Sequence, residues 1–527
     1  MSKGNFVKAA LVLVAVATLA FATGAGLALR GTLSDLLGTR VALPNQNTAG
    51  QQKPKPDKER ARRPGEPAPY YGDLRSLAAV NVRDAALDPV AEGLQYPWAM
   101  ELLSPTEALV SEHGGTLQRV NLRDGSKTAI SGLPAVPSGK GQVGLMDIAL
   151  HPQFGSNHLV YFTHAMESPN KPAHYATALS RAQLVDDELL NVELLLVAEP
   201  YTRAAANFGG AIAFDSAGYL YVSIGDRTIN TRAQDPRLLH GKILRLTADG
   251  STPADNPFIG SSEVDPRIYA MGVRNAQGLV FDTISELLFE AEHGPMGGDE
   301  VNIIEAGRNY GWPTITYGAN YTTENIGLGT HLAGMEQPLY FYLPSIAASP
   351  ITIYRGTMFP EWEGHLLVGA LKGAHVSKLA LVDGQVRSAR AILSEAKGRI
   401  RDLKVASDGS LYLLVQNGGR IMRLHRNPNG NDAEASKERE GVTLYTQLCS
   451  TCHSSGQPDV PQIDRPQDWE TALAQDIGVL YKNTLLGIGD MPAKGLCENC
   501  TDDEIRAAVD FMVAKVAKAR NSSSIAP

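Results

Sequence analysis

Residues 218–226 read GYLYVSIGD, and residues 241–246 read GKILRL. The first stretch is an apolar strand that begins at a glycine, and the second is a strand that contains basic residues. Five similar units lie at residues 107–122, 158–184, 286–304, 364–381 and 409–424. Antiparallel strand units repeated at such spacing are typical of propeller blades. The sequence therefore predicts a six-bladed β-propeller, and the alternative is a β-sandwich whose units resemble one another by chance.

Composition limits the class of protein. The chain has 527 residues, which is too many for one ordinary domain, so two are expected. A formal net charge of -8 argues against nucleic acid as a partner. All four cysteines lie between residues 449 and 500, so the predicted propeller is not a disulfide scaffold.

A Cys-x-x-Cys-His motif, formed by Cys449, Cys452 and His453, lies near the C-terminal end. This motif is the attachment signal for haem c, in which both thiols bond to the haem and the histidine binds the iron. Met491, followed by a proline, is the expected sixth ligand. Ligation by His and Met raises the reduction potential and favours electron transfer. The alternative, a zinc or redox pair of thiols, needs further ligands, and one other pair of cysteines is available.

Helical patterns surround this motif. An amphipathic helix with Val442, Leu444, Tyr445 and Leu448 leads into it. Thr501 to Glu504 form a capping box, after which apolar residues follow at helical spacing. We expect the two helices to pack together in a small four-helix domain around the haem. The apolar residues of the second helix are Ile505, Ala508, Val509, Met512 and Val516.

The N-terminus has the features of an export element. Lys3 and Lys8 precede an uncharged apolar run from Ala9 to Leu29, long enough to cross a hydrocarbon core of ~30 Å. Charge on the N-terminal side places that end in the cytoplasm. The alternative is a signal peptide cleaved after the small residues at 20–22. Either interpretation predicts a periplasmic protein, and the first adds an anchor in the inner membrane.

The expected fold is mainly β: a six-bladed propeller followed by a small all-α cytochrome c domain, with an N-terminal transmembrane or signal helix. The predicted boundaries are 1–30 for the anchor or signal peptide, 31–80 for a Pro-rich and basic linker, 81–426 for the propeller, 427–438 for a second linker and 439–520 for the cytochrome domain.

Several stretches go beyond a generic propeller. They are QYPWAM (95–100), GQVGLMDIALHPQF (141–154), GGAIAFDSAGYLYVSIGDR (209–227), GVRNAQGLVF (272–281), EHGPMGGDEVNIIEAGRNYGWP (292–313), LVGALKG (367–373) and GRIRDL (398–403). Together they resemble the soluble glucose and aldose sugar dehydrogenases that use pyrroloquinoline quinone (PQQ). The C-terminal part resembles short cytochromes of the c-five type, in which a second Cys-x-x-Cys forms a disulfide. Cys497 and Cys500 match that pair.

The resemblance implies a PQQ pocket. PQQ is a tricarboxylate, and Arg and Lys bind carboxylates through charge-assisted hydrogen bonds. Carried over motif by motif, the residues that bind PQQ are Gln142, Arg274, Asn275, Lys372, Arg399 and Arg401.

The resemblance also implies calcium. In the family a calcium ion polarises the quinone as a Lewis acid and is held by backbone oxygens, which here belong to Gly294 and Pro295. Glu300 matches a carboxylate that holds a second, structural calcium.

The chain departs from the family at one catalytic position. A histidine that removes the hydroxyl proton of the sugar is replaced by Asn207, and Ala211 stands where an arginine is usual. An amide cannot accept a proton near neutral pH. Three explanations remain: another base acts, with Asp226 and His293 as candidates; the substrate needs less assistance; or the reaction is lost.

The sequence thus predicts a periplasmic quinoprotein dehydrogenase. It would oxidise an aldose or related alcohol through PQQ and pass electrons to its own haem c and then to a downstream acceptor. The alternative is a degenerate propeller that binds a ligand or partner, attached to an electron-transfer cytochrome.

Overall fold

The computed structural model describes residues 77, 82, 85–321, 326–382, 384–427, 441–457, 460–497, 500 and 502–523. The predicted N-terminal helix and most of both linkers lie outside these residues. Within them, no helix combines the length and the apolar character needed to span a bilayer.

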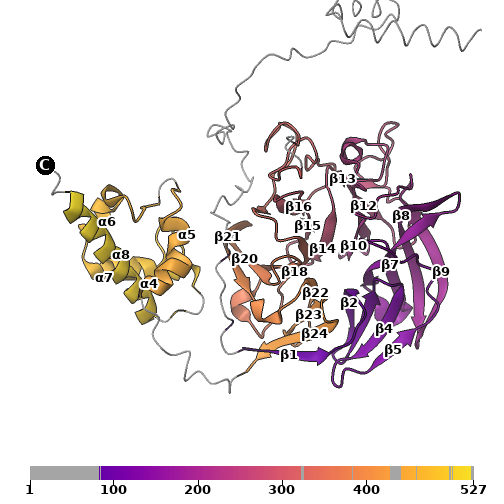
Figure 1. Cartoon of the computed structure of the whole chain (residues 1–527), viewed down its shortest axis with the longest axis horizontal. Coiled ribbons are helices and arrows are strands. Elements are labelled where there is room, and N and C mark those ends of the chain that lie inside the picture. The colour runs from indigo at the N-terminus through magenta and orange to yellow at the C-terminus, as the bar shows by residue number, and fades with distance from the viewer. Residues whose placement is uncertain are drawn as a thin grey trace, which may run out of the picture. The chain divides into compact units, whose positions relative to one another are not determined.

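Six four-stranded antiparallel sheets form the large domain (Figure 1). The first three are β2 (Pro97–Ser104) to β5 (Lys127–Ile130) with β3 (Glu107–Glu112) and β4 (Thr116–Asn121); β6 (Leu145–Leu150), β7 (Leu159–Ser168), β8 (Lys171–Val185) and β9 (Glu188–Val197); and β10 (Gly209–Phe214), β11 (Leu220–Ile224), β12 (Lys242–Leu246) and β13 (Ile268–Met271). The next three are β14 (Ala276–Asp282), β15 (Leu287–Glu292), β16 (Asp299–Ile304) and β17 (Tyr340–Tyr342); β18 (Ala348–Ile353), β19 (Leu366–Ala370), β20 (Val376–Val382) and β21 (Gln385–Ile392); and β22 (Ile400–Val405), β23 (Leu411–Val415), β24 (Arg420–Arg426) and β1 (Ala85–Ala91).

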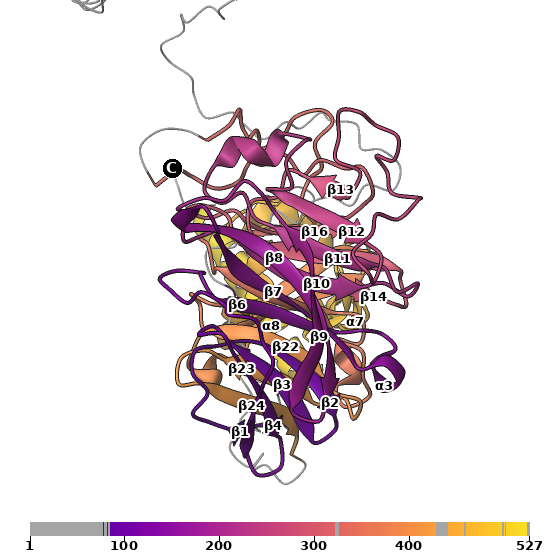
Figure 2. The same cartoon turned by 90° about the vertical axis from the view of Figure 1, so that its right-hand side faces the viewer.

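The first strand of each sheet packs against the first strands of its two neighbours, which closes a ring of six blades. Figure 1 shows β2, β10, β14, β18 and β22 gathered near the centre, and the blade from β6 to β9 lies nearest the viewer in Figure 2. The predicted six-bladed propeller is confirmed, and the sandwich alternative is wrong.

The six sequence units correspond to the second and third strands of the blades. In blade three, for example, Leu220 pairs with Leu246 and Ile224 pairs with Lys242. All residues of β11 and β12 are buried, because both faces of a blade are covered by neighbouring blades.

Both chain ends contribute to blade six. The N-terminal strand β1 pairs antiparallel with the C-terminal strand β24, with Ala85 opposite Arg426. This pairing closes the ring with hydrogen bonds between the two ends of the propeller.

Every second joint between blades carries a buried carboxylate that bonds a backbone amide of the next blade. Asp402 accepts from Met100 N (2.7 Å), Asp147 accepts from Ile212 N (2.7 Å), and Asp299 accepts from Ala348 N (3.1 Å). These bonds satisfy amides of the first strands.

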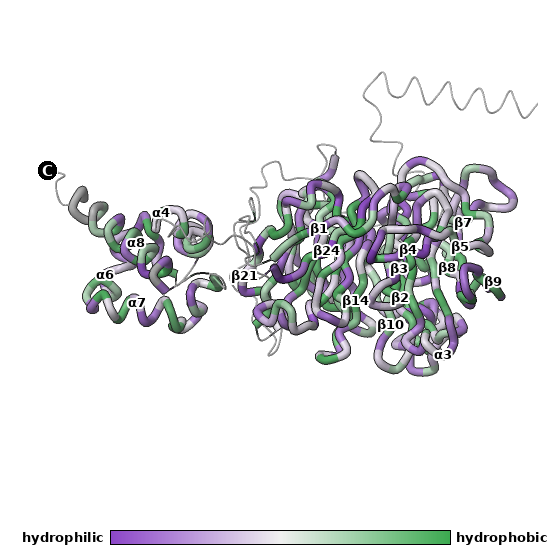
Figure 3. Tube along the Cα trace, turned by 90° about the horizontal axis from the view of Figure 1, so that it is seen from below, coloured by the Kyte–Doolittle hydropathy of each residue, from purple (hydrophilic) through white to green (hydrophobic). Residues whose placement is uncertain are grey.

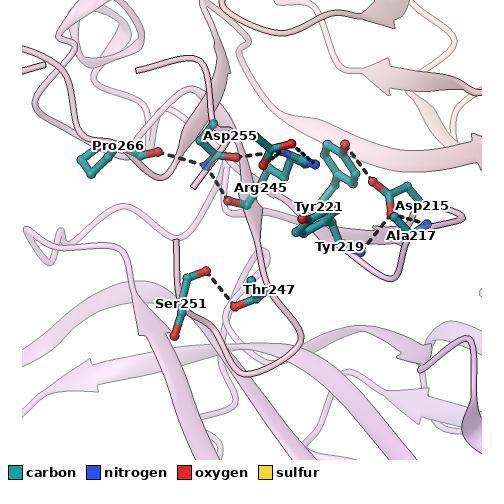
Figure 4. Close-up of polar contacts among 10 residues, drawn as sticks. Asp215, Ala217, Tyr219, Tyr221, Arg245, Thr247, Ser251, Asp255 and Pro266 are labelled. Atoms are coloured by element: carbon teal, nitrogen blue, oxygen red, sulfur yellow. Dashed lines mark hydrogen bonds and ion pairs between the residues drawn. The ribbon is translucent and has the colours of Figure 1, made fainter. Parts of the chain in front are cut away.

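The first strand of each blade starts at the face that we call the upper face, which includes residues 209, 276 and 400. The lower face is held by short-range polar bonds. In blade three, Asp215 accepts from the amides of Ala217 and Tyr219, and Arg245 binds Asp255 at 2.8 Å (Figure 4). Ala85 and Arg426 lie at the lower face, because they pair at its end of blade six.

The C-terminal domain is helical. Its elements are α4 (Gly441–Leu444), a π-helical segment η4 (Tyr445–Cys449), α5 (Ser450–His453), η5 (Pro466–Trp469), α6 (Glu470–Leu473), α7 (Ile477–Leu486), η6 (Ala493–Leu496) and α8 (Asp502–Ser523). Short helical turns in the propeller are α3 (Phe154–Asn157), η1 (Asn230–Gln234), η2 (Pro360–Trp362) and η3 (Ser394–Ala396).

The predicted packing of the first and last helices is confirmed. Helix α4 contacts α8, and Leu444 and Leu448 share a core with Ile505 and Ala508. Val509, Met512 and Val516 are also buried, whereas Val442 is exposed. The predicted cap, Thr501, lies outside the described residues.

Candidate functional site

The residues predicted to bind PQQ lie on the upper face. Arg274 and Asn275 precede β14, Arg399 and Arg401 lie at the start of β22, and Gln142 precedes β6. Lys372 follows β19 and is exposed. Five different loops or strand ends of the ring therefore supply the predicted set, since β14 and β22 each carry two or one of these residues at their upper ends.

Three of the predicted cations surround His293. Burial, followed by the charges of Arg401, Arg274 and Arg399, lowers the pKa of His293 to about 3. Lys372 is not in this group: its backbone N donates to Ile346 O (2.9 Å), and its ammonium group makes no polar contact with the described residues.

Arg274 is fixed by backbone oxygens. Its Nη1 donates to His293 O at 2.8 Å and to Gly294 O at 3.0 Å, and its guanidinium lies 5.3 Å from the ring of Trp312. The backbone N–H groups of Arg274 and Asn275 both donate to the buried carboxylate of Glu292.

Arg401 is more deeply buried. Its guanidinium stacks 3.4 Å from the ring of Trp98 and donates to Ser349 Oγ (2.9 Å) and Gln277 Oε1 (3.0 Å). Burial and the charge of Arg399 lower the pKa of Arg401 to about 9. Arg399 itself donates through Nε to Gln416 Oε1 at 2.9 Å.

A hydrogen-bond chain sets the orientation of His293. Asn275 Oδ1 accepts from Gly209 N (3.1 Å) and Gln277 Nε2 (3.3 Å), so its Nδ2 is free to donate to His293 Nδ1 at 3.4 Å. Because Nδ1 then accepts, the proton of the neutral ring resides on Nε2. The ring presents a donor at Nε2 rather than a base.

Asn207 and Asp226 are paired. Asn207 has a left-handed backbone (φ 54°) and donates through Nδ2 to Asp226 Oδ1 at 2.9 Å. Asp226 is fully buried, and it also accepts from Thr228 N (2.7 Å) and Trp312 Nε1 (2.8 Å). Both carboxylate oxygens are therefore engaged, which suits a group that positions Asn207 more than a group that removes a substrate proton.

Two further predicted residues support the same loop. Gln142 Oε1 accepts from Phe208 N at 2.9 Å, next to Asn207. Ala211 is buried at the start of β10, and its N–H donates to Ser223 Oγ at 2.9 Å. Ala211 also lines a polar axial cavity together with Asp147, Gln277, Arg401 and Lys404.

The fit of PQQ can be judged from buried donors. Arg274 Nε, Arg401 Nε and His293 Nε2 have no hydrogen-bond partner within the described part of the chain. Unsatisfied buried donors are unfavourable, and a ligand rich in carboxylate oxygens would satisfy them. The residues on this face therefore fit a tricarboxylate such as PQQ.

The fit of calcium at the two predicted carbonyls is poor. Gly294 O accepts from Arg274 Nη1, and Pro295 O accepts from Tyr321 OH at 2.8 Å. A calcium ion needs oxygens that are free to coordinate it. In this arrangement it would have to displace both donors, so we derive no catalytic step from calcium at this position.

Glu300 belongs to a second group of oxygens. It lines one cavity with Glu292, Tyr310 and Thr316, and this cavity also reaches Arg274 and His293. Burial, together with the charge of Glu292, raises the pKa of Glu300 well above its usual value. Among the described residues no group of three or more His, Cys, Asp or Glu forms a metal cluster, so a cation here would also need hydroxyl or carbonyl oxygens.

The geometry of the C-terminal domain fits a covalently bound haem. Cys449 and Cys452 are free thiols, three residues apart on a continuous helix, and thus on one face. His453 Nδ1 lies 2.8 Å from Pro461 O, to which it can donate. This bond would leave Nε2 for iron, as for other metal-binding histidines.

The apolar surface of this domain also points to a missing partner. Helix α7 has no fully buried residue, although it contains Ile477, Val479 and two leucines at its end. Leu486 is 69% exposed and Ile488, beside the loop that carries Met491, is 56% exposed. Figure 3 shows hydrophobic and hydrophilic residues alternating along these helices. A haem is the flat apolar group that such a surface would cover.

Cys497 and Cys500 form a disulfide, which confirms the predicted pairing. Both are buried against Leu444 and Ile505.

Sequence reasoning missed several residues of the upper-face site. They are Trp98, Gln277, Glu292 and Trp312, which stack on the cations or hold the backbone of the binding loops. All four lie within the stretches that carried the family resemblance, but their roles depend on contacts between blades.

Comparison with known proteins agrees with this architecture. Residues 94–423 match the family described as glucose / sorbosone dehydrogenase, and residues 436–512 match the family described as cytochrome c oxidase, cbb3-type, subunit III. The chain is 34% identical over 353 residues to aldose sugar dehydrogenase YliI of Escherichia coli, covering 66% of this chain and 93% of that protein. The C-terminal part is 33% identical over 76 residues to cytochrome c5 of Azotobacter vinelandii, covering 14% of this chain and 92% of that protein.

A solved structure is also similar. The PQQ-bound form of aldose sugar dehydrogenase from Streptomyces coelicolor has 28% sequence identity and a TM-score of 0.54, covering 65% of this chain and 98% of that one.

The fold and the two sites define an oxidoreductase made of a sugar dehydrogenase-like propeller and an electron-transferring cytochrome c domain. The chain belongs to the glucose/sorbosone dehydrogenase family and carries a C-terminal cytochrome c domain.

Proposed function

We propose that the protein is a quinoprotein dehydrogenase that oxidises an aldose or a related alcohol on the upper face of the propeller and passes the electrons to its own haem c. The observation that supports this most directly is the group of unsatisfied donors on Arg274, Arg401 and His293. When bound, PQQ supplies the two-electron oxidation of an alcohol, and haem c carries single electrons.

The protein residues have distinct roles in this proposal. Arg274, Arg399 and Arg401 bind carboxylates of the cofactor, and His293 donates through Nε2. Asn275 holds His293 in the required tautomer, as Glu292 holds the backbone of Asn275. Lys372, which is exposed and has no partner in the described residues, would join the set by a change of its side-chain rotamer.

Proton removal is the weakest step. Asn207 Nδ2 is committed to Asp226, so the remaining amide oxygen can accept a hydrogen bond from a substrate hydroxyl but cannot take its proton near neutral pH. Asp226 positions this amide. The hydroxyl proton would then leave to water, and turnover would be lower than with a histidine at this position, since a general base typically contributes ~10²–10⁴-fold.

Haem binding assigns Cys449 and Cys452 to the thioether bonds and His453 and Met491 to the iron. A c-type haem attached in this way is expected in a periplasmic or extracellular protein. Covalent linkage of the two domains makes electron transfer intramolecular, which raises the effective concentration of the acceptor.

A structural calcium between Glu300 and Glu292 is part of the proposal. Two buried carboxylates that line one cavity repel each other when both are ionised, and a divalent cation relieves this repulsion.

One experiment tests the function. The purified haem-containing chain is incubated with PQQ and calcium, a panel of aldoses and alcohols is added, and the absorbance band of reduced haem is followed. Reduction that depends on both PQQ and substrate is the expected result.

The same experiment tests the alternative, a propeller that binds a ligand without oxidising it. The engaged carboxylate of Asp226 and the amide at 207 favour that alternative. PQQ binding without haem reduction by any substrate would support it, and failure to bind PQQ at all would exclude the quinoprotein assignment.

A further inference from the structure

A buried basic cluster lies behind Asp226 in blade three. Its members are Arg227, Arg232 and His240, from the loop between β11 and β12 and from η1 within that loop. Arg227 and His240 are fully buried. The guanidinium of Arg227 lies 3.3 Å from the ring of Phe208, and its two terminal nitrogens donate to backbone carbonyls.

Lys242 holds the cluster together. Its Nζ donates to the carbonyls of Arg232 (3.0 Å), Ala233 (3.0 Å) and His240 (2.8 Å). Three carbonyls around one nitrogen bring the backbones of Arg232 and His240 to the same place. Gly241 adds to this close packing, since a Cβ there would lie 2.4 Å from the side chain of Ala233.

The side chains of this cluster have unsatisfied polar atoms. Arg227 Nε, Arg232 Nη1 and both ring nitrogens of His240 are buried without a hydrogen-bond partner in the part of the chain that the structure describes. Burial, followed by the charges of Arg232, Arg227 and Lys242, lowers the pKa of His240 to about 3. Cations close to one imidazole have this effect.

The local charges do not balance. Asp226 is the carboxylate that acts on both Arg227 and Arg232, and its oxygens are engaged by Asn207, Thr228 and Trp312 rather than by either guanidinium. Two guanidinium groups and one carboxylate leave one positive charge in excess. Buried water could satisfy the donors but would not compensate this charge.

We propose that a single small monovalent anion, of the class of chloride, binds between Arg227, Arg232 and His240. It accepts from Arg227 Nε, Arg232 Nη1 and one ring N–H of His240. This site is separate from the PQQ site and does not depend on the proposed oxidation. It lies behind the Asp226–Asn207 pair, so it would hold the loop that positions Asn207.

The first test uses crystals of the haem-containing protein grown with sodium bromide in place of chloride. An anomalous bromine peak between Arg227, Arg232 and His240 is the expected result. Density that fits only water at this position, in crystals that bind bromide elsewhere or nowhere, would overturn the proposal.

The second test follows thermal and urea unfolding of the propeller in sodium chloride and in sodium gluconate at equal ionic strength. Above its dissociation constant, each tenfold rise in chloride should raise the folding equilibrium constant about tenfold. Arg232→Gln should abolish this dependence. Arg203→Gln, which changes an exposed arginine of the adjacent segment, should retain it.

Equal chloride dependence in wild type and Arg232→Gln would contradict the assignment. If Arg232→Gln does not fold, the bromide crystals of the unchanged chain decide the matter. Because neither readout involves PQQ or sugar, a failure here is distinguishable from a failure of the proposed dehydrogenase activity.

Discussion

Asn207 combines a left-handed backbone with a side chain that donates to a buried carboxylate. Asn and His both tolerate this backbone region better than most residues. A histidine at 207 could donate through Nδ1 to the same oxygen of Asp226 and present Nε2 as a base. We therefore expect Asn207→His to raise the rate of substrate-dependent haem reduction by about 10²-fold or more, with activity increasing as pH rises through ~6.5.

The matched control for this change is Asn191→His. Asn191 also has positive φ, but it is exposed in β9 and bonds Gln183. This variant should leave the rate unchanged. An equal rate in Asn207→His and wild type would show that the proton is removed by another group.

His113 gives a residue-scale prediction about pH. It stacks on Trp98, and burial, followed by the charge of Arg401, lowers its pKa to about 4. The folded pKa lies below the unfolded value, so the unfolded state binds more protons between pH ~4 and ~6.5. Stability from the neutral ring is complete above pH ~6.5 and is lost as pH falls toward 4.

Replacing His113 by Phe keeps an aromatic ring against Trp98 and removes the titrating group. The free energy of unfolding of the PQQ-free propeller should then fall less between pH 6.5 and 4, by up to about 3 kcal/mol. Urea unfolding at several pH values measures this. An unchanged acid slope would mean that other groups dominate the loss.

Glu300 allows a prediction about metal removal. If a calcium ion neutralises Glu292 and Glu300, EDTA should lower the melting temperature of the wild-type chain, and added calcium should restore it. Glu300→Gln should make stability insensitive to both. Glu263→Gln, a change at an exposed carboxylate, is the control and should remain sensitive. Equal behaviour of wild type and Glu300→Gln toward EDTA would exclude calcium at this cavity.

At the scale of elements, strand β1 closes the ring. It supplies the fourth strand of blade six, and Leu87 pairs with Leu424 in that sheet. Removing residues 1–91 should expose the edge of β24 and part of a hydrophobic core, and thus lower stability and increase aggregation. Removing residues 1–80 keeps β1 and should have little effect on propeller unfolding. Similar melting temperatures for the two truncations would show that closure by β1 is not needed.

The second and third strands of each blade could be predicted from the sequence, because local apolar runs such as Leu220–Ile224 carry their own signal. The strand β1 could not, since its sequence AALDPVA is only partly apolar and its partner lies at the other end of the propeller. The first strands were recognisable through family motifs, but not their role in bonding between blades, as for Asp402 and Met100. Such pairings join residues far apart in the sequence, which local patterns do not encode.

The candidate site shows the same limit. Residue type identified Arg274 and Arg401 as possible carboxylate ligands, and the structure places both near His293. The sequence could not show that Gly294 O and Pro295 O already accept hydrogen bonds, or that both oxygens of Asp226 are engaged. Those facts depend on side-chain directions set by neighbouring loops.

At the scale of the whole molecule, the two redox groups are joined by one chain. The connections to both ends of the propeller start at Ala85 and Arg426, on the lower face, whereas the predicted cofactor residues lie on the upper face. If electrons pass within one chain, the rate constant of haem reduction after substrate addition should not change when the protein is diluted. Stopped-flow absorbance at a series of protein concentrations measures this.

A mixing experiment supplies the matched control. A Cys449→Ser, Cys452→Ser chain cannot attach haem but should keep the propeller site, and it can be mixed with an Arg274→Gln, Arg401→Gln chain, which should keep haem but lose PQQ. Haem reduction in this mixture must occur between molecules, so its rate should rise in proportion to concentration and remain below that of the intact chain at low concentration. A wild-type rate that also rises in proportion to concentration would show that the cytochrome domain accepts electrons from other molecules, and that covalent linkage serves a purpose other than direct transfer.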